Sequence, residues 1–340
     1  MGSTTNVSLN FKTALVTGGG GFVGKAVVKQ LLQHNVDVRV IGRNRYPDIE
    51  KLGVTGYVGD LDNLESITYA AKGVDVVFHV AALAGIWGPW ENYYRTNVIG
   101  TENVVRACEA NNVAALVYTS TPSVVFDRKD IIGGNETLPY PTNFLCSYAK
   151  SKVMAEKLVL QNTSTWSCAL RPHLIWGPND PHLLPRLLLA GRRRQLKIVG
   201  NGDNFVDISY IDNVAHAHLL AAMNLTGTKT AAGQAYFISQ GEPVNLWNWI
   251  NKLFELMAVE TISKKISYKT AYKVGASLEF IYKLTRQQNE PKMSRFLAEQ
   301  LAKSHYFSCD KALHDLEYAP IVSTEEGLLK TVQWLKDNGN

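Results

Sequence analysis

Hydrophobic and polar positions alternate in a regular order along the first half of the chain. Short apolar runs are separated by longer amphipathic segments. The runs are Thr13–Thr17, Val36–Ile41, Val74–Val80, Ala115–Thr119 and Cys168–Leu170, and the segments are Phe22–His34, Leu64–Ala71, Tyr93–Ala110 and Tyr148–Gln161. Continuous apolar runs are typical of strands buried on both faces of a parallel sheet. The order therefore predicts an α/β fold with a Rossmann-type, doubly wound parallel sheet.

The pattern changes beyond Arg171, where prolines interrupt the chain at Pro172, Pro178, Pro181 and Pro185. We expect a smaller, mostly helical C-terminal lobe here that binds the substrate. A helix over Asn213–Met223, a strand over Ala235–Ile238 and a helix over Leu246–Met257 are expected to return to the sheet. The expected division gives residues 11–172 and 203–257 to the dinucleotide-binding domain, and residues 173–202 and 258–340 to the substrate lobe.

Composition narrows the class of protein. The 340 residues are 46% hydrophobic and carry a net charge of +5, and Arg192–Arg194 is the longest run of basic residues. This balance argues against a nucleic-acid-binding protein and suits an anionic cofactor or substrate. Residues 1–10 lack the apolar core of a signal peptide, and no stretch reaches the roughly 18 apolar residues of a membrane span. We therefore expect a protein of the cytoplasm that is soluble or at most bound to a membrane surface.

Neither the cysteines nor the histidines have the spacing of a metal site. The four cysteines are far apart along the chain, which also argues against a disulfide framework: Cys108, Cys146, Cys168 and Cys309. The histidines considered as ligands are His79, His173, His216 and His218, and the last two lie two residues apart, on different faces of a helix. We expect no metal in the site.

A glycine-rich turn follows the first expected strand. Residues 17–24 read T-G-G-G-G-F-V-G and lead directly into a helix. Gly18 permits a tight turn, Gly21 lets the backbone approach a pyrophosphate, and Gly24 allows the helix to pack closely on the strand. Glycine-rich turns also occur in ordinary loops, but the strand–turn–helix context favours dinucleotide binding. The expected cofactor contacts are Gly18, Gly20, Gly21, Phe22, Val23 and Gly24.

The end of the second expected strand bears on the choice of cofactor. An NAD enzyme usually places a carboxylate there for the ribose hydroxyls, whereas this chain has Arg43 and Arg45. Guanidinium groups pair well with a phosphate, so we expect NADP(H) rather than NAD(H). The alternative is that both are ordinary surface arginines. Asp60 and Leu61 follow another short strand, where the carboxylate could accept from the adenine amino group or simply lie in solvent.

Tyr148 and Lys152 begin the helix expected over residues 148–161. Their spacing of four residues places them on one face, where a lysine cation favours ionisation of the phenol. A phenol with a pKa near 10 is otherwise a poor base at neutral pH. Such a spacing is frequent by chance, but here it follows a complete set of strand–helix units. It predicts the catalytic pair of a hydride-transfer enzyme.

Three further side chains are candidates beside this pair. Thr121 and Ser123 follow a strand, where either hydroxyl could bond the substrate oxygen. Asn97 could hold backbone or water in the proton path, or could only pack within its helix. Trp87, in the loop after Val74–Val80, is either a packing residue or part of the substrate site.

Together these motifs resemble the extended short-chain dehydrogenase/reductases, and within them the 3β-hydroxysteroid dehydrogenase group. The resemblance extends over segments 18–24, 60–61, 97–107, 118–124, 148–152, 171–180 and 206–213. It implies that Thr121, where the group more often has serine, orients the carbonyl. It also implies that Ala81 and Pro172 contact the cofactor and that His173 lies beside the substrate.

Four segments are similar to a bacterial branch of this group that reduces long-chain 2-alkyl-3-oxo acids in olefin biosynthesis: residues 84–88, 119–124, 174–178 and 295–301. The resemblance thus implies a lipid-like substrate and a homodimer, and a complex with other pathway enzymes is left open. An NAD(P)-linked steroid or sterol 4α-carboxylate dehydrogenase, a nucleotide-sugar epimerase or dehydratase, and a non-enzymatic dinucleotide sensor are the alternatives. A fold signature alone does not decide among them.

Overall fold

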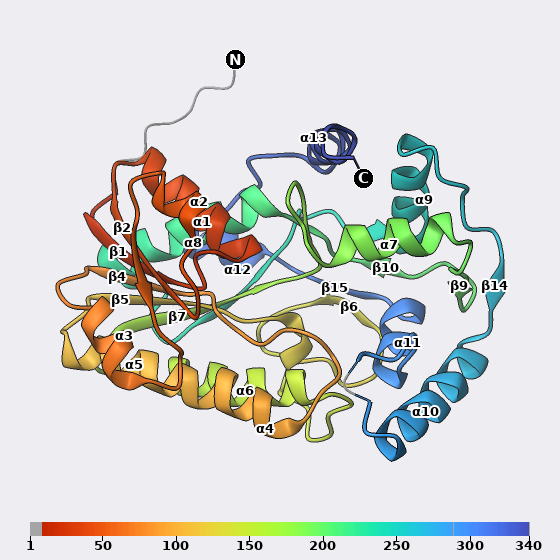
Figure 1. Ribbon diagram of the computed structural model, residues 1–340. Coiled ribbons are helices and arrows are strands. Elements are labelled where there is room, and N and C mark those ends of the chain that lie inside the picture. The colour runs from red at the N-terminus through yellow and green to blue at the C-terminus, as the bar shows by residue number, and fades with distance from the viewer. Residues whose placement is uncertain (1–8, 288, 340) are drawn as a thin grey trace.

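A seven-stranded parallel sheet forms the centre of the computed structural model, which describes residues 9–287 and 289–339 (Figure 1). The strand order β3-β2-β1-β4-β5-β7-β12 confirms the predicted doubly wound sheet. The strands are β1 Thr13–Thr17, β2 Asp37–Gly42, β3 Thr55–Val58, β4 Val76–His79, β5 Ala115–Thr119, β7 Trp166–Pro172 and β12 Ala235–Ile238. The order reverses between β1 and β4, and such a switch point is where parallel sheets bind ligands. The expectation about a signal peptide lies largely outside the described residues.

Helices cover both faces of the sheet (Figure 1). On one face lie α1 Phe22–Gln33, α8 Ile211–Thr226 and α12 Asp310–Leu316, with the short α2 Pro47–Glu50 nearby. On the other lie α3 Leu64–Ala70, α5 Gly100–Ala110 and α6 Ser147–Leu160. The helix expected over residues 93–110 is present in three joined parts: α4 Trp90–Tyr93, a π-helical segment Tyr94–Ile99, and α5. Burial on both faces explains why β4 and β5 are apolar at nearly every position.

The smaller part contains more strand than the sequence indicates. Its helices are α7 Leu183–Arg192, α9 Leu246–Leu256, α10 Tyr268–Leu284, α11 Arg295–Ala302 and α13 Thr324–Asp337. A four-stranded sheet joins β13 Val244–Asn245, β10 Phe205–Val206, β15 His305–Phe307 and β6 Ile131–Gly134. Two further pairs are β8 Ile175–Trp176 with β11 Ser209–Tyr210, and β9 Ile198–Val199 with β14 Lys265–Ile266. These strands are too short to give an alternating pattern in the sequence.

Three segments pack in the other of the two parts of the molecule from the one to which the sequence assigned them. Trp249 and Phe254 of α9 are buried in the core of the smaller part, and β6 joins its sheet. Conversely, Ala312 and Leu316 of α12 are buried in the core beneath the central sheet. Non-local strand pairing and helix packing thus connect these segments across the expected domain boundaries.

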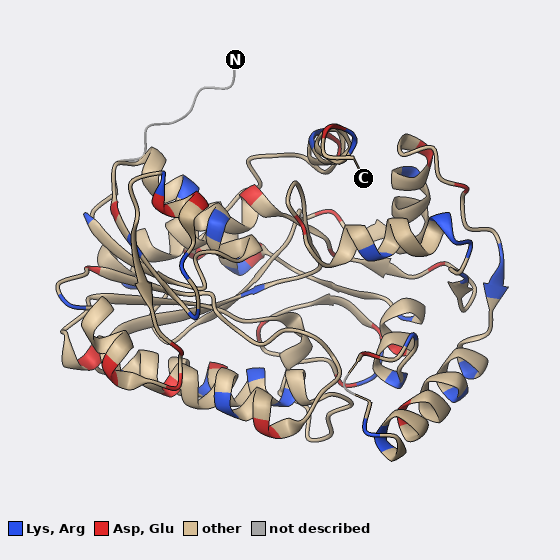
Figure 2. Ribbon diagram, viewed as in Figure 1, with Lys and Arg blue, Asp and Glu red and all other residues tan. Residues whose placement is uncertain are grey.

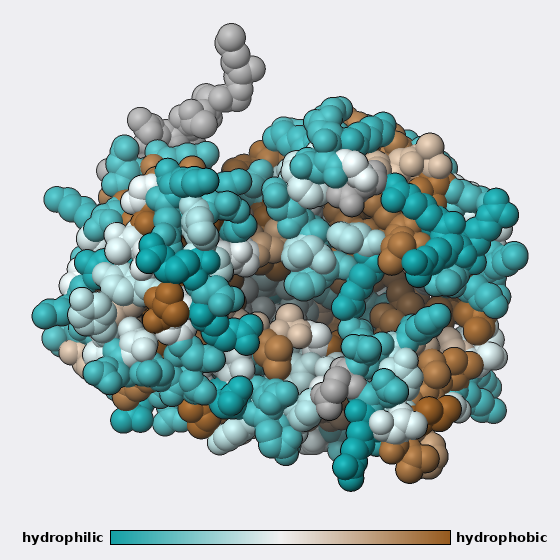
Figure 3. Space-filling model, viewed as in Figure 1, coloured by the Kyte–Doolittle hydropathy of each residue, from teal (hydrophilic) through white to brown (hydrophobic). Residues whose placement is uncertain are grey.

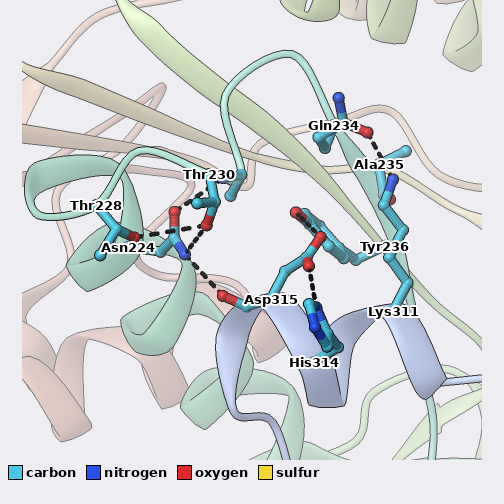
Figure 4. Close-up of polar contacts among 10 residues, drawn as sticks. Asn224, Thr228, Thr230, Gln234, Ala235, Tyr236, Lys311, His314 and Asp315 are labelled. Atoms are coloured by element: carbon cyan, nitrogen blue, oxygen red, sulfur yellow. Dashed lines mark hydrogen bonds and ion pairs between the residues drawn. The ribbon is translucent and has the colours of Figure 1, made fainter.

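Polar contacts attach α12 to the end of the central sheet (Figure 4). The hydroxyl of Tyr236 on β12 donates to the carboxylate of Asp315 at 3.0 Å. Asn224 of α8 donates to the backbone carbonyl of Asp315 at 2.7 Å, and Lys311 donates to the side chain of Gln234 at 2.6 Å. The chain therefore returns to the sheet after forming most of the smaller part.

Candidate active site

A cavity of about 580 Å³ lies at the carboxyl ends of the central strands, and the surface is hollowed between the two parts of the molecule (Figure 3). Its volume is within the usual range for small-molecule sites. It brings together thirteen of the residues singled out in the sequence: Gly18, Gly21, Phe22, Val23, Gly24, Arg43, Asp60, Leu61, Ala81, Thr121, Tyr148, Lys152 and Pro172. The carboxyl ends of six strands, β1, β2, β3, β4, β5 and β7, and parts of α1 and α6 thus converge on one site.

The glycine-rich turn shapes one wall of this cavity. Gly18 has a φ of +66°, and a Cβ there would lie 2.9 Å from the Cα of Ala81. A Cβ on Gly24 would lie 2.2 Å from the carbonyl oxygen of Gly18, so only glycine allows α1 to pack this closely. The N-cap of α1, Gly21, offers no side chain to the first-turn amides. Their N–H groups and the helix dipole therefore suit the pyrophosphate of a dinucleotide.

The two arginines after β2 lie in different surroundings. Arg43 lines the cavity beside Gly42 and Tyr46. Arg45 forms an ion pair with Glu50, in which its Nε donates at 2.7 Å, and it is not among the lining residues. Arg43 is therefore the better placed of the two to meet a phosphate on the adenosine ribose.

Lys152 is buried beside Tyr148 on α6. Its Nζ donates to the backbone carbonyl of Thr119 at 2.7 Å and lies 4.1 Å from the centre of the Tyr118 ring. Burial lowers the pKa of Lys152 to about 7, and the negative charge of Glu156 opposes this shift. Burial raises the pKa of Tyr148 to about 12, and a hydrogen bond with Thr121 opposes it.

Glu156 continues the same face of α6 by one more turn. Its carboxylate accepts from Arg171 Nη2 at 2.6 Å, from Arg171 Nε at 3.0 Å and from the Tyr140 hydroxyl at 2.8 Å. Both members of this ion pair are almost completely buried. The Arg171–Glu156 ion pair connects β7 to α6, one helical turn after Lys152.

Asn97 fixes the loop after β4. Its side chain donates to Leu83 O at 3.1 Å and to Ser151 Oγ at 2.9 Å, and it accepts from Leu83 N at 2.7 Å. Ser151 Oγ in turn donates to Tyr148 O at 2.8 Å. Asn97 is buried in the π-helical segment, a helix irregularity that is frequent at functional sites. It is therefore placed to position α6 against this loop rather than to touch substrate.

Thr121 and Ser123 differ in their access to the cavity. Thr121 lines it, whereas Ser123 is not among the lining residues. The Thr121 oxygen accepts from Ser123 N at 3.2 Å, which caps the 3₁₀ helix Pro122–Val124. Thr121 is thus held rigidly with its side chain near Tyr148.

With this geometry described, comparison with known proteins identifies the chain. The model of the 3-beta hydroxysteroid dehydrogenase/isomerase family matches residues 15–268. The chain belongs to this family. It is accordingly an NAD(P)-dependent oxidoreductase of the short-chain dehydrogenase/reductase type, as the motifs predicted.

Relatives of this 3-beta hydroxysteroid dehydrogenase family member include oxoalkanoate reductases and sterol dehydrogenases. It is 47% identical over 93% of its length to a 2-alkyl-3-oxoalkanoate reductase of Shewanella oneidensis, covering 84% of that protein. It is 44% identical over 92% of its length to the Stenotrophomonas maltophilia protein of the same name, covering 96%. A decarboxylating sterol-4-alpha-carboxylate 3-dehydrogenase of Mus musculus is 34% identical over 97% of the chain and is covered over 92%.

Solved structures agree on the architecture of the family member. The crystal structure of gox2253 aligns with a TM-score of 0.78 at 27% identity, over 96% of this chain and 99% of that one. A dTDP-glucose 4,6-dehydratase of Streptomyces venezuelae with NAD aligns with a TM-score of 0.75 at 21% identity, over 96% and 97%. At that identity the second match shows the fold alone.

Two of the other predicted site residues lie away from the main cavity of the family member. Gly20 faces the ring of Tyr46, which a Cβ would approach to 2.1 Å. His173 is hydrogen-bonded through Nε2 to His305 Nδ1 at 2.6 Å, and His305 Nε2 contacts Gln300 O at 2.9 Å. Since a carbonyl only accepts, His305 carries its proton on Nε2 and His173 donates. Burial lowers the pKa of His173 well below its usual value, so the pair is neutral.

Trp87 lines a second cavity, of about 390 Å³. Its Nε1 donates to Gln287 O at 3.2 Å, and its ring meets Tyr282 edge-on. The walls come from residues 86–89, residues 145–147, the end of α10 and the start of α11. Residues 145–147 directly precede main-cavity residue Tyr148, and residues 86–89 begin two residues after main-cavity residue Ala84.

Sequence reasoning missed several residues of the site. The ring of Tyr118 packs against the ammonium group of Lys152. Three residues of the smaller part line the cavity: Asp180, His182 and Leu183. Glu156 could have been found, because it lies four residues after Lys152 on the same helical face. The Asp180 loop carries no such signal. Among the described residues, no group of three His, Cys, Asp or Glu side chains could hold a metal ion.

Proposed function

We propose that the protein reduces a long-chain 2-alkyl-3-oxoalkanoic acid to the 2-alkyl-3-hydroxyalkanoic acid, using NADPH. The observation that carries this proposal is the 47% identity, over 93% of the chain, to a protein named 2-alkyl-3-oxoalkanoate reductase. The cavity adds chemical support, because a tyrosine, a lysine and a threonine line it together with the glycine-rich turn.

The preference for NADPH rests on Arg43. No carboxylate follows β2 at the position where NAD enzymes usually bind the ribose hydroxyls. The Arg43 guanidinium lines the cavity there and can pair with a 2′-phosphate through charge-assisted hydrogen bonds. Arg45 takes a secondary role, because Glu50 already occupies its guanidinium.

In this reaction NADPH, when bound, supplies a hydride to the keto carbon. Tyr148 donates its phenolic proton to the oxygen of that carbon, and its pKa of about 12 keeps it protonated at neutral pH. The Thr121 hydroxyl bonds the same oxygen and orients it toward the phenol. Protonated Lys152 stabilises the phenolate left on Tyr148 and holds the nicotinamide ribose, while Thr119 O fixes its position.

The second cavity gives the substrate room for one of its two alkyl chains. The keto carbon of a 2-alkyl-3-oxo acid bears one alkyl chain, and the neighbouring C2 bears the second alkyl chain and the carboxylate, so the substrate needs space for two apolar chains near Tyr148. Trp87, Leu145 and Phe296 offer an apolar path on the α10 side. This gives Trp87 the substrate role expected of it. We further propose a homodimer through α5 and α6, which share one face of the sheet.

Oxidation of a sterol or steroid 3β-alcohol is the second candidate. It is favoured by the 34% identity over 97% of the chain to the mouse sterol-4-alpha-carboxylate 3-dehydrogenase. Both reactions would use the same tyrosine–lysine pair, and in a 2-alkyl-3-oxo acid as in a sterol 4α-carboxylate the reacting carbon is next to the carbon that bears the carboxylate. They differ in direction, reduction against oxidation, and in the shape of the apolar part of the substrate.

Isotope transfer tests the proposed reaction directly. The enzyme is incubated with NADPH deuterated at C4 of the nicotinamide and with a racemic long-chain 2-alkyl-3-oxo acid, and the product is analysed by mass spectrometry. We expect a 3-hydroxy acid carrying one deuterium at C3, and no such product from Tyr148→Phe. Absence of deuterated product with the wild-type enzyme, together with oxidation of a 3β-hydroxysteroid, would replace the proposal by the second candidate.

A further inference from the structure

Helix α10 carries an exposed apolar stripe along its outer side. Val274, Phe280, Ile281 and Leu284 are 44%, 69%, 49% and 74% exposed. Val274 and Ile281 are seven residues apart, Ile281 and Leu284 three, and Phe280 and Leu284 four. At 3.6 residues per turn, all four lie within an arc of about 120° on one side of the helix. The helix lies at the edge of the molecule, away from the central sheet, and apolar side chains gather over it (Figures 1 and 3). Large aromatic and aliphatic side chains this exposed usually have a partner.

The opposite side of α10 is already occupied. Ala271, Gly275 and Glu279 are buried against α11, and a Cβ on Gly275 would lie 2.6 Å from the carbonyl carbon of Ser294. This close contact holds the helix firmly in place. The exposed stripe therefore lies on the outer surface, because a different face of α10 packs against the rest of the molecule.

Positive charge surrounds the stripe (Figure 2). Lys269, Lys273, Lys283 and Arg286 are exposed, and none of them forms an ion pair with a residue that the structure describes. The one acidic residue of α10, Glu279, is buried and paired with Arg295 at 2.7 Å. The outer face thus combines apolar side chains with basic ones and no exposed carboxylate.

We propose that α10 docks on an anionic lipid surface, with the stripe inserted among the acyl chains and the basic residues among the head groups. An amphipathic helix of this composition lies in the plane of the interface. A second copy of the chain is a poor occupant, because a two-fold contact would bring the same lysines face to face. Across the described residues no helix could span a membrane, so the contact is peripheral.

Docking here would connect a lipid surface to the second cavity. Tyr282, Lys283 and Arg286 belong both to this end of α10 and to the cavity walls. A long-chain acid could then pass from the lipid phase along α10 toward Tyr148. Only this connection rests on the proposed function; the docking itself rests on the outer face of the helix.

Vesicle co-sedimentation of the full chain tests the docking. The two vesicle types are phosphatidylcholine alone, and equal parts of phosphatidylcholine and phosphatidylglycerol. We expect binding to the anionic vesicles, weakened by salt, with a partition coefficient at least about tenfold lower for Phe280→Glu/Leu284→Glu. The matched control is Leu313→Glu/Leu329→Glu, which adds the same two charges at exposed leucines of α12 and α13 and should change binding by less than about twofold.

Each outcome decides the proposal. Equal binding by the wild type and the double variant would overturn it, as would equal binding to both vesicle types. If the wild type binds no vesicles but forms an oligomer that the double variant loses, the stripe is a protein contact and the proposal is wrong. Thermal melting and NADPH affinity unchanged from the wild type show that the variants are folded. Because no turnover is measured, failure of docking is distinguishable from failure of the proposed reaction.

Discussion

The Nζ atom of Lys152 donates a 2.7 Å hydrogen bond to the backbone carbonyl of Thr119, which joins α6 to the end of β5. Thr121 follows on the same strand end, and Tyr148 precedes on the same helix. This hydrogen bond therefore connects the strand end that carries Thr121, which we propose orients the substrate oxygen, to the helix that carries Tyr148, the proposed proton donor. The predictions below test this arrangement.

Removing the Tyr148 hydroxyl should abolish turnover without affecting the cofactor. For Tyr148→Phe we expect a loss of kcat of about 100-fold or more, since general acid catalysis contributes on that scale. The dissociation constant for NADPH, measured by fluorescence titration, should stay within about twofold. Tyr57→Phe is the matched control, because Tyr57 lies on β3 outside the cavity. Near-normal turnover by Tyr148→Phe would remove tyrosine from the mechanism.

The two arginines after β2 should respond differently to truncation. Arg43→Ala should raise the KM for NADPH by about 10- to 100-fold, the effect of losing a charged hydrogen bond, and leave the KM for NADH nearly unchanged. Arg45→Ala should have a much smaller effect, because Arg45 is paired with Glu50 outside the cavity. The opposite ranking of the two variants would assign the 2′-phosphate to Arg45.

Reduction should slow as the pH rises above neutrality. Burial lowers the pKa of Lys152 to about 7, so the protonated form that stabilises the Tyr148 phenolate is present below that pH and lost above it. The pKa of Tyr148, about 12, lies too high to cause the decline. We expect kcat/KM for reduction to fall between pH 7 and 9. Lys152→Arg keeps its charge across this range, so its residual activity should be flat with pH. A wild-type profile that is level to pH 9 would contradict the assignment to Lys152.

Breaking the buried ion pair beneath the site should cost much stability. Glu156→Gln leaves Arg171 charged and poorly compensated in the core, and such changes typically lower the free energy of unfolding by about 3–5 kcal/mol. Glu326→Gln breaks an exposed pair with Lys330 and should cost less than about 1 kcal/mol. Urea denaturation of the two variants measures the difference, and equal losses would show that Glu156 contributes no more than a surface charge.

Long, continuous patterns in the sequence gave the most reliable predictions. The alternation of apolar runs and amphipathic segments predicted five of the seven central strands and most of their flanking helices, because burial on both faces of a parallel sheet leaves a strong pattern. It did not predict that α12 packs beneath this sheet. Tyr148 and Lys152 were found because a helical repeat fixes their spacing. The packing role predicted for Gly24 is confirmed by its contact with Gly18.

Contacts between distant segments could not be predicted in this way. β6 and β15 pair across 170 residues of chain, and each has only a few residues with which to form a pattern. The sequence alone does not distinguish the roles of Arg43 and Arg45. The structure distinguishes them, because Arg45 forms an ion pair with Glu50 and Arg43 does not. His173 was expected beside the substrate, but its ring is bonded to His305, which comes from a segment with no recognisable motif.

The most direct test of the proposed function is a steady-state comparison of substrates and cofactors with the purified wild-type enzyme. NADPH and NADH oxidation would be followed by absorbance with a long-chain 2-alkyl-3-oxo acid, and NADP⁺ and NAD⁺ reduction with a 3β-hydroxysteroid. We predict that kcat/KM is highest for the 2-alkyl-3-oxo acid with NADPH. Turnover of the steroid with NAD⁺, and none of the acid with either cofactor, would contradict both the substrate and the role of Arg43.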